Sequence, residues 1–397
     1  MQLAERMSQI KPSPTLALDA KAKALKAAGA DVVNFGVGEP DFNTPDHVKA
    51  AGVKAIEDNF TRYTPAGGTV ELKEAVCAKF KRDNGLTFTP DQVVINCGGK
   101  HTLYNLAQVL FGPGDEVIVP APYWVSYPPI VALAGAVPVI APTLEKNDFK
   151  MTPNDLEKAI TPRTRAIIMN SPSNPTGSVY SREELRALAE ILLKNRIIVI
   201  SDDIYEKIIY DGKKFCNLAN LSPEMAELTI IAHGLAKTYA MTGWRIGFMA
   251  GPKDVASAVT KIQSQSTSNP CSIAQKAGVA ALNGPEDSVL VMKAAFEKRR
   301  DFVVETLNKI EGVKCFTPGG AFYAFPTVSS YFGKGVGKWQ IKGSDDLADY
   351  LLEEALIAAV PGSAFGEDSC IRLSYAISLD DNRKGLERMA EALYKLK

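Results

Sequence analysis

The alternation of short apolar strands with amphipathic helices constrains the fold of this chain more than any other feature. Between residues 136 and 169 a strand-like segment is followed by the acidic helical segment PNDLEKAI and then by a second strand, RAIIMN. The helical segment SREELRALAEILLKN and the apolar strand RIIVIS repeat the pattern. Strands that alternate with helices in this way are typical of a parallel sheet covered by helices. The sequence therefore predicts an α/β fold.

The C-terminal part of the chain shows a different order of helices, strands and loops, which predicts a second domain. A long helix, KAAFEKRRDFVVETLNKI, precedes the segment GVKCFTPGGAFYAFP, the helix DDLADYLLEEA and the strand-like CIRLSYA. This order indicates a smaller α+β domain, and a chain of 397 residues is long enough for two domains. We expect the basic residues of the long helix to form a solvated face.

Composition excludes several classes of function. Lys plus Arg equals Asp plus Glu at 45 each, so the chain lacks the basic field of a nucleic-acid binder, and we expect a small-molecule partner. The N-terminus MQLAERMSQIKPSP is polar where a signal peptide would be apolar, and no apolar run approaches the ~20 residues of a membrane span. We therefore expect a cytoplasmic protein. Six cysteines without a close CxxC pair and three dispersed histidines predict reduced thiols and no metal site.

The segment HGLAKTYAMTGWRIGF, residues 233–248, contains a candidate for a reactive amine. Lys237 lies among small residues, and Gly234 and Ala236 leave room beside it for a bulky molecule. An amine that attacks a carbonyl must be neutral for part of the time, and burial or a nearby cation lowers a lysine pKa toward that condition. Arg245 offers a planar, charged fork for an oxyanion such as phosphate. Because most lysines are solvated surface residues, the segment needs support from other parts of the chain.

The segment QVVINCGGKHTLYNLAQVLF is a candidate anion site. It predicts a strand, a glycine pair and a helix that begins near Lys100. The N–H groups at a helix start carry partial positive charge, and Gly98 and Gly99 would let a phosphate approach the backbone closely. Glycines also serve strand-to-helix turns for steric reasons alone, so both interpretations stay open.

Charged residues at or within apolar strands form a third group, because their burial is costly without a partner. Asp202 follows the strand RIIVIS, and a pyridinium nitrogen would be a suitable cationic partner. Its neighbour Asp203 fits a helix cap or a solvated acid better. Arg372 lies within the strand-like CIRLSYA, so we expect it to have a carboxylate partner, which could be structural.

Loops supply further candidates. In VVNFGVGEPDF the chain breaks around Gly38, which frees backbone N–H groups. Asn174, in the loop NSPSNPTG, follows a strand and so falls at the carboxyl edge where such sheets bind ligands. Trp124, in PYWVSYP, could cover a flat cofactor, although aromatic core filling explains the ring nearly as well. Tyr63, beside the bend TPAGG, is by itself explained as a packed turn residue.

The segment AKTYAMTGWRIG resembles the lysine segment of the class I and II aminotransferases, which carry pyridoxal 5'-phosphate (PLP) as a Schiff base on that lysine. VGEPDF, YTPAGG, GGK, PYWVSYP, NSPSNPTG, SDDIY, GGAFY and IRLSYA appear in the family's order, so the resemblance runs essentially end to end. It implies fold type I, with a mostly parallel seven-stranded sheet between helices in a large domain, residues 46–290. Residues 1–45 and 291–397 would form the small α+β domain. Family members often have serines where Gly234 and Ala236 stand here, so a hydroxyl contact to the phosphate is lost.

The resemblance also implies the roles of individual residues. Catalytic roles fall to Lys237, Asp202 and Tyr205. Cofactor contacts fall to Gly98, Gly99, Lys100, Trp124, Asn174, Asp202, Tyr205, Lys237 and Arg245, with Tyr63 reaching in from the partner subunit of a homodimer. Substrate contacts fall to Gly38, Trp124, Asn174, Arg372, Lys100, Ser13 and Thr15, with no metal.

Within this family the sequence favours transamination of aspartate with 2-oxoglutarate, in a ping-pong reaction through the internal aldimine on Lys237. Arg372 would bind the α-carboxylate, and the loop QSQSTSNP holds no arginine for a second one, which leaves Lys100 as the candidate. The resemblance to family members with a GGK segment implies that this lysine acts together with Ser13 and Thr15. One alternative is that Lys100 only helps the phosphate. Others are a prephenate/glutamate or aromatic aminotransferase, a PLP lyase that does not transaminate, and a PLP-free binding module.

Overall fold

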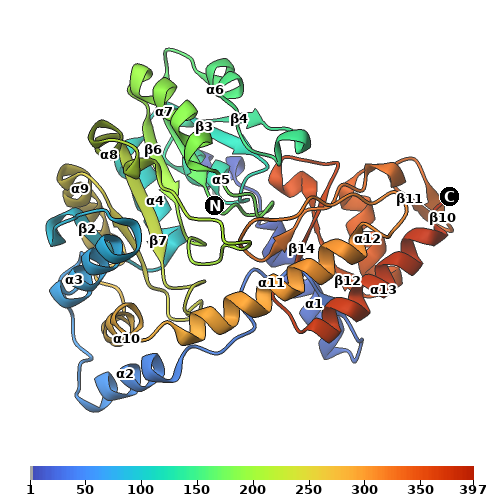
Figure 1. The fold of residues 1–397 in the computed structure, drawn as a ribbon, viewed down its shortest axis with the longest axis horizontal. Helices are drawn as coiled ribbons and strands as arrows, with labels where there is room; N and C mark the ends of the chain where they lie inside the picture. The colour runs from blue at the N-terminus through green and yellow to red at the C-terminus, as the bar shows by residue number, and fades with distance from the viewer. Residues whose placement is uncertain (1–2) are drawn as a thin grey trace.

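The computed structural model describes residues 3–397, and a seven-stranded sheet forms its larger part (Figure 1). In spatial order the strands are β2 (Val93–Asn96), β8 (Gly247–Ala250), β7 (Thr229–Gly234), β6 (Ile198–Asp202), β5 (Thr164–Asn170), β3 (Glu116–Ala121) and β4 (Val137–Pro142). Strand β8 runs antiparallel to both neighbours, and the other pairs are parallel. The prediction of a mostly parallel seven-stranded sheet is therefore confirmed.

Helices cover both faces of this sheet, because successive strand residues point to opposite sides and both sides are apolar. In β5, Ile168 packs in one core cluster with Leu106 of α4, while Ile167 packs in another with Leu188 of α7. The helices of this part are α2 (Asp46–Glu57), α3 (Val70–Lys79), α4 (Gly99–Leu110), α5 (Tyr127–Leu133), α6 (Pro153–Ala159), α7 (Arg182–Asn195), α8 (Pro223–Leu228), α9 (Lys253–Ser264) and α10 (Ser272–Asn283). The α7 start is fixed by a capping box in which Ser181 and Glu184 satisfy each other's backbone N–H groups.

A second group of elements packs at one end of α11 (Asp287–Leu307), the long helix that extends along both parts (Figure 1). Its strands and helices are β1 (Val33–Asn34), β9 (Tyr323–Ala324), β10 (Gly335–Val336), β11 (Trp339–Gln340), β12 (Ile357–Ala358), β13 (Val360–Pro361), β14 (Ile371–Ser374), α1 (Pro14–Ala27), α12 (Ser344–Ala355) and α13 (Leu379–Lys395). Strands β13, β14 and β9 form an antiparallel sheet, and β1 pairs in parallel with β12.

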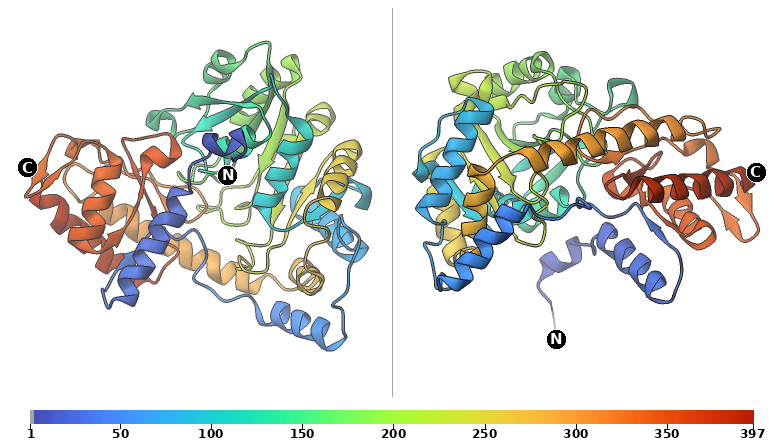
Figure 2. Two further views of the ribbon diagram at one scale, coloured as in Figure 1. Left: turned by 180° about the vertical axis from the view of Figure 1, so that it is seen from behind. Right: turned by 60° about the horizontal axis from the view of Figure 1, so that its bottom comes forward.

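The two ends of the chain are thus joined in one structural unit. The pairing of β1 with β12 is reinforced by a small apolar cluster that includes Ala22 of α1 and Leu352 and Ala358 of the C-terminal part. Figure 2 shows the N-terminal helix α1 beside the C-terminal elements. The domain limits 1–45, 46–290 and 291–397 stay a prediction. Single-turn segments complete the chain at Glu5–Gln9, Phe80–Asn84, Pro90–Gln92, Glu145–Asn147, Leu218–Asn220, Ser329–Tyr331 and Gly362–Phe365.

One expectation about α11 is wrong. Arg300 belongs to the basic group predicted to be solvated, but it is buried. Its guanidinium donates to both carboxylate oxygens of Asp211, at 2.7 and 2.8 Å, and to the carbonyl of Pro318. A bidentate pair of this kind compensates the burial of the charge, and it links α11 to a loop of the larger part.

Two further observations concern the whole described chain. Within residues 3–397 every helix is too short or too polar to cross a lipid bilayer. All six cysteines are free thiols, as predicted.

Candidate active site

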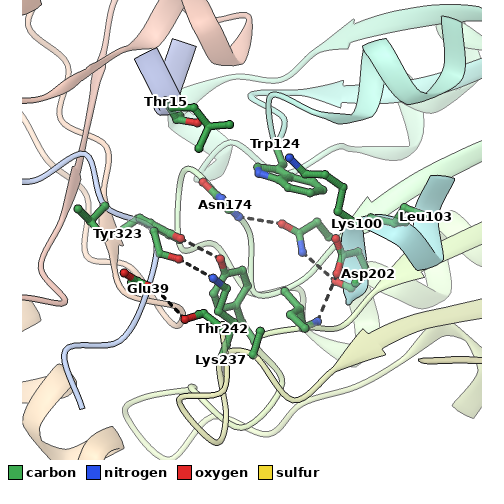
Figure 3. Close-up of a pocket in the computed structure, with 18 of the residues that line it drawn as sticks. Thr15, Glu39, Lys100, Leu103, Trp124, Asn174, Asp202, Lys237, Thr242 and Tyr323 are labelled. Atoms are coloured by element: carbon green, nitrogen blue, oxygen red, sulfur yellow. Dashed lines mark hydrogen bonds between the residues drawn. The ribbon is translucent and has the colours of Figure 1, made fainter. Parts of the chain in front are cut away.

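A cavity of about 410 Å³ lies at the carboxyl edge of the parallel strands, where the sheet faces the C-terminal part (Figure 3). Predicted site residues that line it are Thr15, Gly38, Gly99, Lys100, Trp124, Asn174, Asp202, Tyr205, Lys237, Arg245 and Arg372. Predicted residues that do not line it are Ser13, Tyr63 and Gly98. The volume is typical of a site for a small organic ligand.

The start of α4 forms a cradle of backbone N–H groups at one end of the cavity. Gly98 caps this helix at φ 95°, and no side chain caps its first turn. A Cβ at Gly98 would lie 2.4 Å from Nη2 of Arg245, and one at Gly247 would lie 2.4 Å from the carbonyl carbon of Gly98. The two glycines therefore let the guanidinium and strand β8 approach the helix start. Free N–H groups beside a guanidinium are a favourable site for a phosphate.

The segment between β7 and β8 carries Lys237. Its side chain is half-buried, and Nζ donates to the carbonyl of Gly38. Burial lowers the pKa of this amine to about 8, with a smaller lowering from the charges of Arg372 and Arg245 and an opposing effect of Glu39. The amine is thus neutral more often than an ordinary lysine at the same pH.

The absence of serines near this lysine has a steric reason at one position. A Cβ at Gly234 would lie 2.9 Å from the carbonyl oxygen of Ile246 and 3.1 Å from Cα of Gly247. Any larger residue at this position would have to displace strand β8, so the glycine follows from how closely β7 and β8 pack here.

Asp202, at the end of β6, is buried and faces the cavity. Burial raises the pKa of its carboxyl, and a hydrogen bond from the Tyr127 hydroxyl, 2.7 Å to Oδ2, acts in the opposite direction. Asn170 holds the same residue by its backbone, because its Nδ2 donates to the Asp202 carbonyl over 2.8 Å. Asn170 Oδ1 also accepts a hydrogen bond from the Asn174 N–H, so the side-chain amide of Asn170 contacts the backbone of both Asp202 and Asn174.

Asp203 differs from the prediction. It is buried and accepts hydrogen bonds from Oγ of Ser201, at 2.7 Å, and from Nδ2 of Asn217. The expectation of a helix cap or a solvated acid is therefore wrong. Two neutral donors compensate this carboxyl away from the cavity, and burial raises its pKa well above the usual value.

Arg372, on β14, has no acidic partner within the described chain. It is 2% exposed, and it donates to Oδ1 of Asn174 at 3.0 Å and to the carbonyl of Gly36 at 2.9 Å. Its guanidinium carbon lies 4.5 Å from the ring centre of Tyr323, and its Nε has no partner among the described residues. The carboxylate partner predicted from the sequence is not supplied by residues 3–397, where no acid lies within 4 Å of this arginine.

Tyr205 forms a hydroxyl pair with Tyr323, 2.8 Å between the oxygens, and the Tyr323 ring lies beside the guanidinium of Arg372. Sequence reasoning missed Tyr323, Tyr127 and Asn170 as site residues. Tyr127 and Tyr323 stand inside the motifs PYWVSYP and GGAFY, and Asn170 is the register partner of Asp202 across β5 and β6. The motifs and the strand register were therefore the signals that could have indicated them.

Ser13 and Tyr63 do not line the cavity in this single chain, although Ser13 is next to Thr15, which does. The Ser13 hydroxyl bonds that of Thr15 at 3.0 Å, and the Tyr63 side chain is 91% exposed on the surface. Among residues 3–397, His, Cys, Asp and Glu gather nowhere in a group that could hold a metal ion.

Four cations line the cavity: Lys100, Lys237, Arg245 and Arg372. None of them has an ion pair with a carboxylate of the described chain. Lys100 stands over the Trp124 ring with Nζ 5.0 Å from its centre, and burial together with Arg245 lowers its pKa. Arg372 is buried and its charge is costly without an acidic partner, and the other three cations face the same space, so the arrangement fits a ligand set with several anionic groups and a flat ring.

Comparisons with known proteins agree with this chemistry. The model of the family "Aminotransferase class I and II" matches residues 30–389. The aspartate aminotransferase of Geobacillus stearothermophilus is 51% identical over 98% of both chains. The aspartate/prephenate aminotransferase of Nitrosomonas europaea is 49% identical over 99% of this chain and 100% of its own. The structure of Thermus thermophilus aspartate aminotransferase with maleate superposes with a TM-score of 0.93 at 42% identity, covering 99% of this chain and 100% of that one.

Proposed function

Because the chain belongs to the class I and II aminotransferases, we propose that it exchanges the amino group of aspartate with 2-oxoglutarate, forming oxaloacetate and glutamate. It is a PLP-dependent enzyme, as members of this family are. The observation that carries the substrate proposal is the group of four cations without carboxylate partners around one cavity.

The residues present fit PLP. The N–H groups at the start of α4 and the guanidinium of Arg245 would hold its phosphate, which explains why no side chain caps that helix. Trp124 would cover the face of the ring, and the carboxylate of Asp202 would meet the ring nitrogen. Asn174 and Tyr205 would form hydrogen bonds with the phenolic oxygen of the ring.

When bound, PLP supplies an aldehyde that exchanges amino groups and a ring that accepts electrons. The rest of the chemistry belongs to side chains of this protein. Lys237 Nζ, with a pKa of about 8, can accept the proton from the α-carbon of the bound amino acid. As the ammonium, it would then donate this proton to a carbon of the cofactor. Asp202 would keep the ring nitrogen protonated, and Arg372 would hold the α-carboxylate so that the α-proton faces the amine.

The second carboxylate of aspartate is assigned to Lys100. Its amine lies over Trp124 at the cavity wall, and Thr15 lines the same cavity from α1. The related Thermus enzyme was solved with maleate, a dicarboxylate, which supports a site for two carboxylates in this family. A lysine is a flexible point charge, so prephenate with glutamate is the alternative pair, and the name of the Nitrosomonas relative includes both aspartate and prephenate.

The test replaces Lys100 by methionine, which keeps the length of the stem against Trp124 and removes the charge. We expect kcat/KM for aspartate to fall by a factor that corresponds to a loss of ~2–5 kcal/mol in transition-state stabilisation. The values of kcat/KM for alanine and phenylalanine should change little. The dissociation constant of PLP serves as the control. If acidic and neutral donors lose equally and PLP binds more weakly, Lys100 serves the phosphate and the aspartate assignment is wrong.

We also propose a homodimer in which Tyr63 of one subunit contacts the phosphate bound by the other. An exposed fraction of 91% for a tyrosine, together with exposed Val53, Ile56 and Val70 on nearby elements, supports an interface on this side of the chain. Cytoplasmic location stays a prediction of the sequence.

A further inference from the structure

Tyr127 is a buried polar residue for which the proposed function names no task. It begins α5, and its side chain is 2% exposed. Its hydroxyl donates to Oδ2 of Asp202 over 2.7 Å. The other hydrogen bond to this carboxylate within residues 3–397 comes from the Ile204 N–H to Oδ1 and is long, at 3.4 Å. Oδ1 is therefore the oxygen that is left for a molecule in the cavity.

The turn that carries Tyr127 also carries Trp124. The Tyr127 N–H donates to the Trp124 carbonyl over 3.0 Å, and the two rings meet edge to face with centres 5.4 Å apart. Both side chains line the cavity, and Figure 3 shows Trp124 and Asp202 facing the same space. One short turn thus places an aromatic face and a hydroxyl donor at a fixed distance from each other.

The type of donor matters for what Asp202 can do. A buried carboxylate is stabilised in its charged form by a hydrogen bond, but a lysine or arginine would neutralise it and compete with any cation in the cavity. A tyrosine hydroxyl donates a hydrogen bond without adding a charge. Because Asn170 already holds the backbone of Asp202, the Tyr127 bond acts on the side chain alone.

We propose that Tyr127 is a positioning residue that orients the carboxylate of Asp202, so that its free oxygen meets the protonated ring nitrogen of PLP. This inference rests on the proposed function, in which Asp202 faces that nitrogen. A merely structural hydroxyl would stabilise the fold without distinguishing one ring atom of the cofactor from another.

The experiment measures dissociation constants of the apoprotein for PLP and for the analogue in which CH replaces the ring nitrogen. Tyr127→Phe should weaken PLP about tenfold, equivalent to about 1.4 kcal/mol, and should leave the analogue within about twofold. The matched control is Tyr350→Phe, which removes another buried hydroxyl, bonded to the Ala392 carbonyl at 2.8 Å outside the cavity. It should change neither constant. Equal weakening for PLP and analogue in Tyr127→Phe would overturn the inference.

Asp202→Ala separates this inference from the proposed function. On that background Tyr127→Phe should have no further effect on PLP binding, because the hydroxyl has lost the group through which it acts. If Asp202→Ala itself weakens PLP and analogue equally, the assigned role of Asp202 is wrong. If it weakens PLP selectively and Tyr127→Phe does not, only the role of Tyr127 is wrong. Thermal unfolding sets a temperature at which all variants are folded, and Tyr127→Leu, which also lacks the hydroxyl, must show the same selectivity.

Discussion

At the scale of residues, burial sets the chemistry of the site. Lys237 is neutral more often than a surface lysine at the same pH because its surroundings remove water from the ammonium form, and Arg372 and Arg245 add repulsion. Asp202 experiences the same burial in the opposite sense, and the Tyr127 hydroxyl limits the rise of its pKa. The site thus contains an amine that can be neutral and a carboxylate that can stay charged.

The pKa of about 8 for Lys237 makes a prediction about the apoprotein. Only the neutral amine can attack the aldehyde of PLP, so the rate constant of recombination should rise about tenfold per pH unit below pH 8 and level off above it. Stopped-flow absorbance from pH 6 to 10 measures this profile. A midpoint near the ordinary lysine value of 10.5 would contradict it.

The same shift predicts the sign of a stability change. The folded pKa lies below the unfolded value of 10.5, so the unfolded chain binds more protons between about pH 8 and 10.5. This group's contribution to the free energy of unfolding should therefore rise with pH across that window and be lost as the pH falls through 8. The difference between wild-type and Lys237→Met apoprotein, in urea titrations at several pH values, isolates the lysine.

At the scale of elements, the anion cradle depends on the contact between β8 and the start of α4. Gly247 is the strand residue that touches this turn, and its missing side chain is what allows the contact. Strand β8 is also the antiparallel member of the sheet, held between β2 and β7. Its position is fixed on both sides, so a side chain added there must displace the helix.

Gly247→Ala tests this contact. The added Cβ would lie 2.4 Å from the carbonyl carbon of Gly98 and 2.5 Å from the N atom of Gly99, so the first turn of α4 must shift. We expect a loss of ~1–3 kcal/mol in the free energy of unfolding and at least roughly tenfold weaker PLP binding. Urea titration and equilibrium dialysis measure the two effects.

Gly112→Ala is the matched control, because Gly112 follows the other end of α4 and a Cβ there would meet no atom within 4 Å. It should leave both quantities nearly unchanged. Normal PLP affinity in Gly247→Ala would show that the start of α4 does not hold the phosphate.

At the scale of the whole molecule, the cavity is built from distant parts of the chain. Thr15 and Gly38 come from the N-terminal segment, Asp202 and Lys237 from the sheet and its loops, and Arg372 from β14. The pairing of β1 with β12 brings the first of these segments to the last. Tyr63 is a predicted cofactor residue that does not line the cavity of the single chain and is exposed at the surface, which is the reason to assign it to a partner subunit.

Hybrid dimers test that assignment. Lys237→Ala and Tyr63→Phe homodimers should each be strongly impaired, and mixing them should produce hybrids in which one site carries neither substitution. Activity should rise on mixing toward about a quarter of the wild-type level per total site, if subunits exchange freely. Tyr394→Phe, at another exposed tyrosine, is the control and should be active alone. Full activity of a monomer at high dilution, or of Tyr63→Phe alone, would contradict the proposal.

The sequence by itself determined the features that depend on local order along the chain. Strand and helix alternation follows from side-chain periodicity, which is why a parallel sheet covered by helices could be predicted, whereas the number of seven strands came from the resemblance to the family. The ends of β6 and β5 could be located from their apolar runs, so Asp202 and the loop of Asn174 were expected at one edge of the sheet. The motif order around Lys237 pointed to the family in the same way.

Only the tertiary structure decided which polar groups meet. Tyr127 and Asp202 are 75 residues apart, and Arg372 and Asn174 are 198 apart, so no local pattern specifies either pair. The sequence predicted a solvated face for Arg300 and a helix cap or solvent for Asp203, and both were wrong, while the carboxylate partner predicted for Arg372 is left to the substrate because no acid of the described chain supplies it. A buried polar group must be satisfied by some partner, but packing selects that partner from many possible ones. The sequence therefore indicates which polar side chains would be costly to bury, and the fold decides which group compensates that cost.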